Sequence, residues 1–473
     1  MEPTVVSGPS VAAPSSGLRL APALGWGGSC LLVFHGAYAS DQGWLAFIFP
    51  FLLVPLVRLA SGRAALYGGL ALGLGLYGPQ LGFFWTIFGF PAVVLWLVLA
   101  AWIAVFLLIG SRVRRWMPGP GPGLGLALAV LWTGLEYFRC ELYYLHFSWL
   151  TPGMALAKGT PMAALSFAGV HGTTLLAFLA AGWVWFGRLP LRILGAALGL
   201  ALAVWNQVPS PPPPSDRLLH VAGAQTEGAR EDELPRILDQ VLAQHPSAQL
   251  MLLPEYALEG MPGHHLLEWC RLRKRHLVVG GRVDLGNRRF RNTAFVIDRL
   301  GQIVFRQTKS IPIQFFDDGE PATEQGLWPS PWGPLGIAIC YDLSYTRVID
   351  ELVRLGAVGL VIPTMDAWTW GAHQHALHAR IAPLRAAEYR IPILRCASSG
   401  VSQLVQAGGL VTASAPMSDT VQIFGGDIKL GGQGSLPWDR WIAPLCAVAS
   451  LLTSVVLAAR PLLRPISHQP LFR

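Results

Sequence analysis

The sequence predicts a multi-span α-helical membrane domain, with about eight transmembrane helices in all, joined to a mixed α/β domain. Three observations predict this fold class. Hydrophobic residues make up 52% of the 473 residues and charged residues 13%, about half of the roughly 25% typical of soluble proteins. The apolar residues are concentrated between positions 24 and 206 and again between 441 and 459. Between these regions, residues 217–432 carry normal charge and alternate strand-like with helix-like segments.

This composition excludes several classes of protein. A protein that is soluble over its whole length needs more charge, and a disordered or nucleic-acid-binding tail needs far more, so we expect no nucleic-acid partner. The six cysteines include no Cys-x-x-Cys pair, which indicates neither a zinc site nor a disulfide framework. We therefore expect no metal and no cofactor.

A helix needs about 20 mostly apolar residues to cross a bilayer. The apolar runs predict seven spans before the α/β domain and an eighth at residues 441–459. The first of them is short, and the alternative is a signal-peptide core that ends at Ala37-Tyr38-Ala39. The seven expected spans are 24–38, 43–60, 65–87, 90–110, 121–138, 164–187 and 191–206.

Basic residues predict the orientation, because Lys and Arg mark the cytoplasmic side of a membrane protein. With eight spans, the loops richest in arginine fall on one side together with both termini. The α/β domain, inserted between spans seven and eight, then lies on the opposite face, which in a bacterium is the periplasm. The loop after span five, with Arg139 and Lys158, is the exception. The arginines on the expected cytoplasmic side are Arg58, Arg63, Arg112, Arg114, Arg115, Arg188, Arg192, Arg460, Arg464 and Arg473.

The expected organisation has six parts. Four successive prolines at 211–214 cannot continue a helix, so they mark a stiff linker between the two domains. The parts are a cytoplasmic arm (1–23), a transmembrane domain (24–206), a Pro-rich linker (207–216), the periplasmic α/β domain (217–432), a linker with the eighth helix (433–459) and a cytoplasmic tail (460–473).

Three chemically reactive side chains follow predicted strands of the α/β domain. Glu255 follows the run 250–253, Lys309 the run 303–306, and Cys340 the run 336–339. Sites in α/β proteins lie at strand ends. A carboxylate can take the proton of a thiol, and a lysine can stabilise an oxyanion. A thiol just before a helix is also favoured as thiolate. The alternative is a small core cysteine, a solvated carboxylate and a surface lysine.

Residues 218–425 resemble the carbon–nitrogen hydrolase, or nitrilase, superfamily. The matching motifs are Leu-Leu-Pro-Glu-Tyr at 252–256, Arg-Gln-Thr-Lys at 306–309 and Gly-Ile-Ala-Ile-Cys-Tyr-Asp at 336–342. Shorter stretches at 366–368, 385–388 and 395–400 also match. The resemblance implies an αββα sandwich in which Glu255, Lys309 and Cys340 are the catalytic residues.

The membrane-spanning half of the chain points to one family within this superfamily. Seven spans, a nitrilase-like domain and one further span are similar to the apolipoprotein N-acyltransferase family. Trp132 to Arg139 and Phe147 to Leu150, with Gly153 after them, resemble segments of that family. This resemblance covers the chain from about residue 24 to residue 459.

The resemblance implies a two-step acyl transfer. Cys340 attacks a phospholipid ester with Glu255 as base, and Lys309 with backbone amides holds the oxyanion. The acyl chain then passes from the Cys340 thioester to the α-amine of the diacylglyceryl-cysteine of a lipoprotein. The implied partners are a phospholipid donor, a diacylated lipoprotein and a bacterial inner membrane, and we expect a monomer.

The sequence departs from the family at several positions. Met365 stands where the family usually has Asn, and Asp342 where it usually has Glu. The second acid of the family is not cleanly present; Glu320 is favoured slightly over Asp317, which lies nearer by spacing. The supporting or substrate-binding residues that we expect are Glu320, Tyr341, Asp342, Asp366 and Trp368.

Other features leave alternatives open. His373, His375 and His378 have metal-like spacing, but a helix surface near the site is the better interpretation. Glu136 and Arg139 in span five either pair with each other or mark a headgroup site. Four tryptophans either line a lipid entrance or pack in the core; they are Trp328, Trp332, Trp368 and Trp370.

Three other functions remain open from the sequence. The first is a membrane-tethered amidohydrolase in which water replaces the amine. The second is an N-acyltransferase with a different amine acceptor. The third is a non-catalytic assembly protein, against which the complete Glu255, Lys309 and Cys340 set argues.

Overall fold

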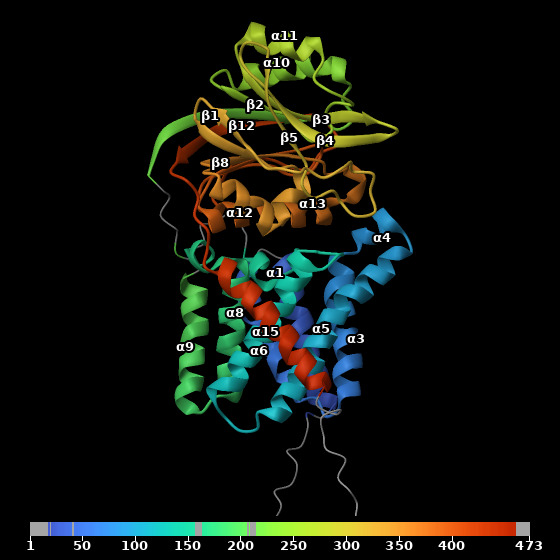
Figure 1. Cartoon of the computed structure of the whole chain (residues 1–473), viewed down its shortest axis with the longest axis vertical. Helices are drawn as coiled ribbons and strands as arrows, with labels where there is room; N and C mark the ends of the chain where they lie inside the picture. Colours follow the sequence, from blue (N-terminus) through green and yellow to red (C-terminus); the bar gives the residue numbers. More distant parts are fainter. Residues whose placement is uncertain are drawn as a thin grey trace, which may run out of the picture.

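The computed structural model describes residues 18, 20–39, 42–156, 163–205, 208 and 214–459. The chain forms a helical bundle and an α/β sandwich that lie end to end (Figure 1). Most of the expected N-terminal arm and Pro-rich linker and the whole C-terminal tail fall outside the described residues. Lys158, Arg460, Arg464 and Arg473 fall outside them as well.

The bundle is built from the apolar segments. The short helix α2 is flanked by the 3-10 turns η1 (Gly43–Phe47) and η2 (Val54–Arg58), and α6 continues into a π-helical turn, η3 (Phe138–Leu142). The helices are α1 (Leu20–Ala39), α2 (Phe49–Leu53), α3 (Gly62–Gln80), α4 (Phe83–Phe88), α5 (Pro91–Trp116), α6 (Pro122–Tyr137), α7 (Pro152–Ala155), α8 (Ala163–Phe186), α9 (Leu189–Trp205) and α15 (Asp439–Ala459).

Four helices in the described part of the chain are long and apolar enough to cross a membrane: α1, α5, α8 and α15. The segment 43–58 and α9 are apolar but shorter, so the count of eight spans stays a prediction. The segment expected as one span over 65–87 is two helices, α3 and α4, with Pro79 in the last turn of α3. Pro50 and Pro55 likewise divide the expected second span.

Helix α1 is an integral part of the bundle. Cys30, Phe34 and Tyr38 are buried within it. The guanidinium of Arg380, from the α/β sandwich, donates to the carbonyl oxygens of Ala37 (3.2 Å) and Tyr38 (2.6 Å). This packing supports its interpretation as a helix of the membrane domain.

Glycines allow the bundle helices to approach closely. A Cβ at Gly69 would lie 2.4 Å from Cα of Ala104, and one at Gly73 would lie 2.5 Å from Cα of Ala100. Small residues at such contacts drive helix association in lipid, where no hydrophobic force acts between helices. The backbones of α3 and α5 therefore pack directly against each other.

The α/β domain is a four-layer sandwich, as the resemblance implied. Its two six-stranded sheets have the orders β12-β1-β2-β3-β4-β5 and β11-β10-β9-β8-β7-β6. The strands are β1 (Ser215–Gln225), β2 (Leu250–Leu252), β3 (His276–Gly286), β4 (Arg289–Ile297), β5 (Ile303–Thr308), β6 (Leu327–Ser330), β7 (Gly333–Ile337), β8 (Gly359–Thr364), β9 (Ile393–Ala397), β10 (Ser402–Val405), β11 (Val411–Ala415) and β12 (Gln422–Gly431).

Helices cover both outer faces of the sandwich. Helices α10 (Leu234–Gln244) and α11 (His264–Arg273) cover the first sheet at the end away from the bundle (Figure 1). Helices α12 (Thr346–Arg354), α13 (Ala372–Ala379) and α14 (Ile381–Tyr389) cover the second sheet and lie between it and the bundle. Buried apolar residues of α12 and α14 form one core with the bundle helices. The sandwich therefore sits directly on the membrane domain.

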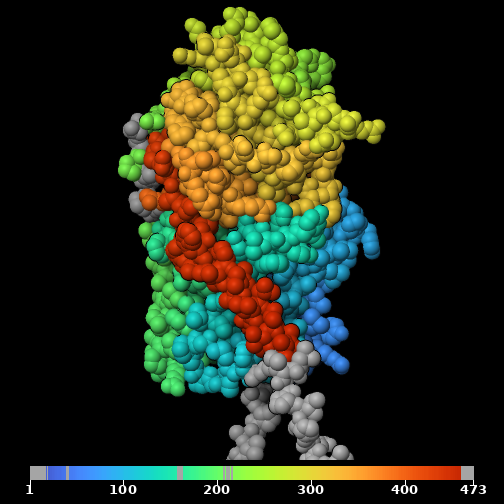
Figure 2. All heavy atoms as spheres, in the orientation of Figure 1, coloured from blue at the N-terminus to red at the C-terminus, as the bar shows by residue number. Residues whose placement is uncertain are grey.

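A buried charge network joins the two domains. Arg440 of α15 pairs with Glu388 of α14 (3.0 Å) and with Asp350 of α12 (2.8 Å). Asp439 pairs with Arg440 and accepts hydrogen bonds from two backbone amides of α8. At this point α8 bends at Gly169 (φ +75°), where a Cβ would lie 2.2 Å from the Asp439 carboxylate. Helix α15 then crosses the outside of the bundle (Figure 2).

Candidate active site

The three residues expected to react do converge. Glu255 follows β2, Lys309 follows β5 and Cys340 follows β7, so each side chain lies where a strand ends. Lys309 Nζ lies 2.9 Å from Glu255 Oε1. Met365 links Glu255 to Cys340, because its amide donates to Glu255 Oε2 and its carbonyl oxygen accepts from the Cys340 thiol. All three side chains are almost completely buried, so their charges act on one another with little screening by water.

Cys340 occupies a sharp turn. Its φ angle is +52°, a left-handed conformation that non-glycine residues rarely adopt and that concentrates at functional sites. The thiol donates to the backbone oxygen of Met365 at 3.5 Å. The segment that follows is a short 3-10 turn, Cys340–Ser344, and α12 begins only at Thr346. Because α12 does not begin directly after Cys340, its helix dipole acts on the thiol more weakly than the sequence suggested.

The electrostatic environment favours a thiol at rest. Burial raises the pKa of Cys340 well above its ordinary value, Glu255 raises it further, and Lys309 only partly opposes them. Burial also raises the pKa of Glu255, although Lys309 lowers it. Burial acts to lower the pKa of Lys309, but the carboxylates of Glu255 and Asp318 outweigh it, so that pKa is raised. The site therefore favours a thiol over a resting thiolate, with a carboxylate in the same cluster that can accept its proton.

The second acid at the site is Asp318, which the sequence analysis missed. Its Oδ2 lies 2.7 Å from Lys309 Nζ, and its Oδ1 accepts hydrogen bonds from Tyr256 (2.7 Å) and Asn292 (3.0 Å). The same Asn292 amide donates to Glu255 at 2.6 Å. Lys309 therefore lies between two carboxylates that are held in place by a shared asparagine.

Neither acid favoured from the sequence contacts Lys309. Glu320 pairs with Arg289, and its side chain is 34% exposed, whereas Asp318 is 5% exposed. Asp317 lines a space next to the ion pair of Lys309 and Asp318. The sequence held one signal, since residues 317, 318 and 320 are all acidic and lie close after Lys309. Spacing along a loop could not choose among them.

Asp342 and Tyr341 support the nucleophile turn from its other side. Asp342 accepts hydrogen bonds from the backbone amides of Ser310 (3.0 Å), Ile311 (2.7 Å) and Ile339 (3.0 Å). It thereby fastens the loop after Lys309 to the turn that carries Cys340. Burial raises the pKa of Asp342 to about 6. The ring of Tyr341 lines the pocket described below.

The segment after β8 provides the remaining predicted residues. The Met365 amide donates to Glu255 Oε2 at 2.7 Å and its carbonyl oxygen accepts from the Cys340 thiol, so the backbone of this residue contacts both the base and the nucleophile. Asp366 is buried and pairs with Arg395 (2.6 Å) and His378 (2.6 Å). Trp368 is 41% exposed and lies at the surface.

The histidines of α13 do not converge. His373 contacts Gln80 of the bundle, His375 contacts the carbonyl oxygen of Ala367, and His378 contacts Asp366. Their different partners argue against a shared metal site for these three side chains. The helix-surface interpretation fits only His373, because His375 and His378 are buried.

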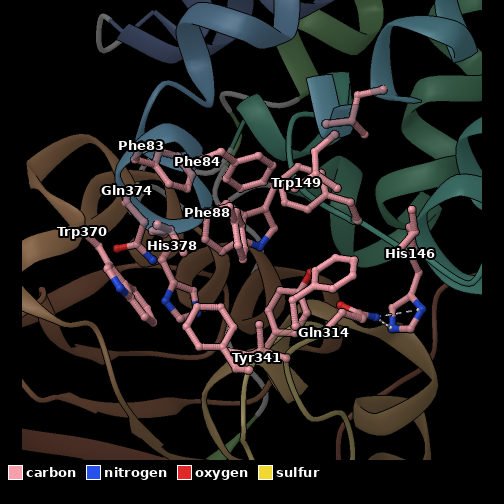
Figure 3. Close-up of a pocket in the computed structure, with 18 of the residues that line it drawn as sticks. Phe83, Phe84, Phe88, His146, Trp149, Gln314, Tyr341, Trp370, Gln374 and His378 are labelled. Carbon is pink, nitrogen blue, oxygen red and sulfur yellow. Dashed lines mark hydrogen bonds between the residues drawn. The ribbon is translucent and has the colours of Figure 1, made fainter. Parts of the chain in front are cut away.

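Cys340 lines an apolar pocket between the sandwich and the bundle. Figure 3 shows other side chains of its lining. The pocket encloses about 880 Å³, including its open mouth. Its walls come from α4, α5, the loops 145–149 and 313–316, and α13. Labelled aromatic side chains in Figure 3 include Phe83, Phe84 and Phe88 of α4 together with Trp149, Tyr341 and Trp370. A reactive thiol thus faces a space suited to an aliphatic chain.

A second space of about 570 Å³ lies beside the site. It is lined by Glu255, Lys309 and Asp318, and it shares Ile313, Phe316 and Trp370 with the apolar pocket. The two spaces therefore adjoin along these three shared residues, with Cys340 lining the first and Glu255 and Lys309 the second. Of the four tryptophans considered, Trp370 lines both spaces, whereas Trp328 is buried and packs on Trp332.

Two charged residues of the bundle support the pocket indirectly. Glu136 pairs with His171 (2.9 Å) and accepts from the Trp132 indole, so it does not pair with Arg139 as one alternative proposed. Arg139 instead donates to the carbonyl oxygen of Trp149 at 3.4 Å. The indole of Trp149 donates to Ser344 Oγ, which places its ring in the pocket wall.

Comparisons with known proteins agree with both halves of the chain. The family model for the apolipoprotein N-acyltransferase N-terminal domain matches residues 29–183, and that for carbon-nitrogen hydrolase matches residues 220–426. An apolipoprotein N-acyltransferase of Azotobacter vinelandii is 28% identical, with 92% of this chain and 96% of the relative covered. One of Nitrosomonas europaea is 24% identical, with 84% and 92% covered. A carbon-nitrogen hydrolase crystal structure from Helicobacter pylori G27 matches 52% of this chain and 99% of its own at 17% identity, with a TM-score of 0.39.

Proposed function

The chain belongs to the apolipoprotein N-acyltransferase family, and we propose that it transfers a fatty acyl chain from a phospholipid to the α-amine of the N-terminal diacylglyceryl-cysteine of an apolipoprotein, as the last step of lipoprotein maturation. The acyl chain travels as a thioester on Cys340. The observation that carries this proposal is the position of Cys340, since its thiol faces an apolar pocket whose far wall is formed by bundle helices. A soluble amide hydrolase has no need of such a wall.

In the first step Glu255 takes the proton of the Cys340 thiol, and the sulfur attacks the ester carbonyl of the phospholipid. The carbonyl oxygen becomes an oxyanion, which the Lys309 ammonium and backbone amides stabilise. The ester C–O bond then breaks, and Glu255 returns the proton to the departing lysophospholipid oxygen. The product is an acyl thioester whose aliphatic chain lies among the aromatic side chains of the apolar pocket.

In the second step the neutral α-amine attacks the thioester carbonyl. A C–N bond forms, Glu255 accepts a proton from the nitrogen, and the C–S bond breaks. The sulfur leaves with the electron pair and regains the proton from Glu255. The apolar lining keeps water away from the thioester, which favours transfer to the amine over hydrolysis.

The enzyme is membrane-embedded, and we propose that it lies in a bacterial inner membrane with the domain 217–432 on the periplasmic side. The arginine distribution of the loops supports this orientation. The contact surface between α12–α14 and the bundle keeps the pocket at the level of the lipid headgroups. We propose that the monomer is active, because Glu255, Lys309, Cys340 and the pocket walls all come from one chain.

Incubation with a labelled phospholipid and a synthetic diacylated lipopeptide tests the function. We expect mass spectrometry to find one added acyl chain on the peptide α-amine, with lysophospholipid formed in equal amount. Without peptide, the protein itself is expected to gain one acyl mass that hydroxylamine removes. Release of free fatty acid at the same rate with and without the peptide would favour a hydrolase and contradict the proposal.

Substitutions of Asp318 and of Glu320 are expected to have different effects on the rate of acyl transfer. Asp318→Asn removes the charge-assisted bond to Lys309, and we expect acyl transfer to fall about 10–100-fold. Because the Asp318 carboxylate raises the pKa of Glu255, the variant lowers that pKa, and the acid limb of the pH–rate profile moves to lower pH.

Glu320→Gln is the matched control, since the Glu320 side chain bonds only to exposed Arg289 among the described residues. We expect its rate to stay within about two-fold of wild type, as for other exposed ion pairs. Equal losses in the two variants would contradict the assignment of Asp318 as the second acid. An unchanged acid limb in Asp318→Asn would contradict its effect on Glu255.

A further inference from the structure

Two polar side chains of α13 line the apolar pocket and have no role in the two steps above. Gln374 and His378 are each 3% exposed. They lie four residues apart on one helix, so they project from the same face. Figure 3 shows both on the pocket wall, with Trp370 and Tyr341 nearby. Trp149 stacks on the His378 ring at 5.2 Å and fixes its plane.

Asp366 determines which atoms of these side chains face the pocket. Gln374 Nε2 (3.3 Å) and His378 Nδ1 (2.6 Å) both contact the same oxygen, Asp366 Oδ1. A carboxylate only accepts hydrogen bonds, so both side chains turn a donor towards it. The contact of 2.6 Å places the imidazole proton on Nδ1, because two lone pairs would repel at that distance. Arg395 binds the other oxygen and keeps Asp366 ionised.

The remaining polar atoms of the two side chains, Gln374 Oε1 and His378 Nε2, are both acceptors. Gln374 Oε1 is buried without a hydrogen-bond partner among the described residues. The contacts of His378 with Asp366 and Arg395 both involve Nδ1; Nδ1–H donates to Asp366, and the Arg395 guanidinium is only an electrostatic neighbour of that nitrogen. The Nε2 edge of the ring is left to accept. Burial lowers the pKa of His378, against the opposing effect of Asp366, so the ring is neutral and Nε2 carries a lone pair.

Two acceptors in an apolar pocket require a ligand that brings N–H or O–H groups. An acyl chain has none, and an ester oxygen can only accept. The reactant that must carry donors to the thioester is the amine. We propose that Gln374 and His378 form an amine-binding subsite, in which Oε1 and Nε2 accept hydrogen bonds from a primary amine beside Cys340.

This inference rests on the proposed acyl transfer and adds the residues that hold its nucleophile. The primary amine has two sources in the reaction, namely the α-amine of the acceptor and the headgroup of an ethanolamine phospholipid. Both present the same N–H donors. The two half-reactions separate them, because only the acceptor amine is absent while the thioester forms.

The test uses the full-length protein in phospholipid vesicles and four variants. His378→Phe keeps a ring to stack on Trp149 but has no acceptor, and Gln374→Met removes the amide. His378→Gln keeps an acceptor near the Nε2 position. His373→Phe is the control, because this exposed histidine lies on the same helix outside the pocket lining. Thermal unfolding of each variant verifies folding.

Thioester formation is measured first with phosphatidylglycerol and with phosphatidylethanolamine, and single-turnover transfer is then measured over a range of lipopeptide concentrations. We expect His378→Phe and Gln374→Met to form the thioester within about two-fold of wild type but to transfer it about 10–100-fold more slowly, as expected for lost hydrogen bonds. Half-saturation is expected to need more lipopeptide. His378→Gln recovers most of the rate, and His373→Phe matches wild type.

A loss confined to thioester formation from phosphatidylethanolamine also supports an amine subsite and assigns the amine to the donor lipid. Wild-type transfer in both variants would overturn the subsite, as would an equal slowing of both half-reactions with both lipids. A wild-type protein that forms the thioester but never passes it to the lipopeptide would overturn the proposed function itself, a result distinct from failure of the subsite alone.

Discussion

Cys340→Ala is expected to abolish acyl transfer while the protein remains folded in the membrane. Without the sulfur there is no group at the turn to carry the acyl chain, and removal of a catalytic nucleophile costs at least about 10³-fold in rate. The substitution deletes one buried sulfur and keeps the Cβ, so the φ of +52° is no harder to adopt than before. The measurements are single-turnover transfer to the lipopeptide and the intact mass of the protein after incubation with phospholipid.

Cys270→Ala is the matched control for this prediction. Cys270 is also buried, but it lies on α11, on the face of the sandwich away from the bundle. We expect it to retain wild-type transfer and the hydroxylamine-sensitive acyl mass, both of which Cys340→Ala lacks. Transfer by the Cys340 variant at more than about one hundredth of the wild-type rate would refute the thioester route.

Lys309→Met is expected to impair both activity and stability. Loss of the cation leaves the buried carboxylates of Glu255 and Asp318 facing each other without compensation, and breaking a buried pair in this way costs about 3–5 kcal/mol. The oxyanion also loses a charged donor, which lowers the rate by about 10²–10³-fold. Because Lys309 lowers the pKa of Glu255, its removal raises that pKa, and the acid limb moves to higher pH.

The double variant Lys309→Met/Asp318→Asn separates these effects. Removal of one charge of each sign restores the balance of the buried cluster, so we expect the thermal unfolding temperature to recover in part. The rate of acyl transfer stays low, because no cation is left to hold the oxyanion. Recovery of the rate together with stability would mean that Lys309 acts only through folding. The shift of the acid limb in Lys309→Met is opposite to that in Asp318→Asn, which gives an internal check.

The strand-end residues could be predicted because the motifs around them resemble those of the nitrilase superfamily. Glu255 and Lys309 follow strands of one sheet and Cys340 follows a strand of the other, so the spacing alone left bland alternatives open for all three. Asp318 could not be selected in this way. It lies in a loop next to Asp317 and close to Glu320, and the contact that distinguishes it is made with Lys309 across the loop. Loop geometry decides that contact, and residue type alone does not reveal it.

In the bundle, too, some features could be predicted from the sequence and others could not. Apolar runs located its helices, but breaks near Pro50, Pro55 and Pro79 changed their boundaries. The partner of Glu136 is His171, 35 residues further along the chain, and no local pattern predicts that pair. The direction of the pKa shift of Cys340 could not be predicted either, because burial dominates that pKa and cannot be read from the neighbouring sequence.

The charge network between the two domains also constrains the order of assembly. Glu388 and Asp350 belong to helices that leave the ribosome before Arg440, the buried cation that both of them contact. Until Arg440 docks, the face of the sandwich that meets the bundle has carboxylates around a vacant position, and such a face is poorly suited to close against apolar helices. We therefore expect the C-terminal helix, α15, to dock last and to complete the interface between the two domains. A chain shortened before Asp439 would retain every reacting group but lack the buried cation that Glu388 and Asp350 contact.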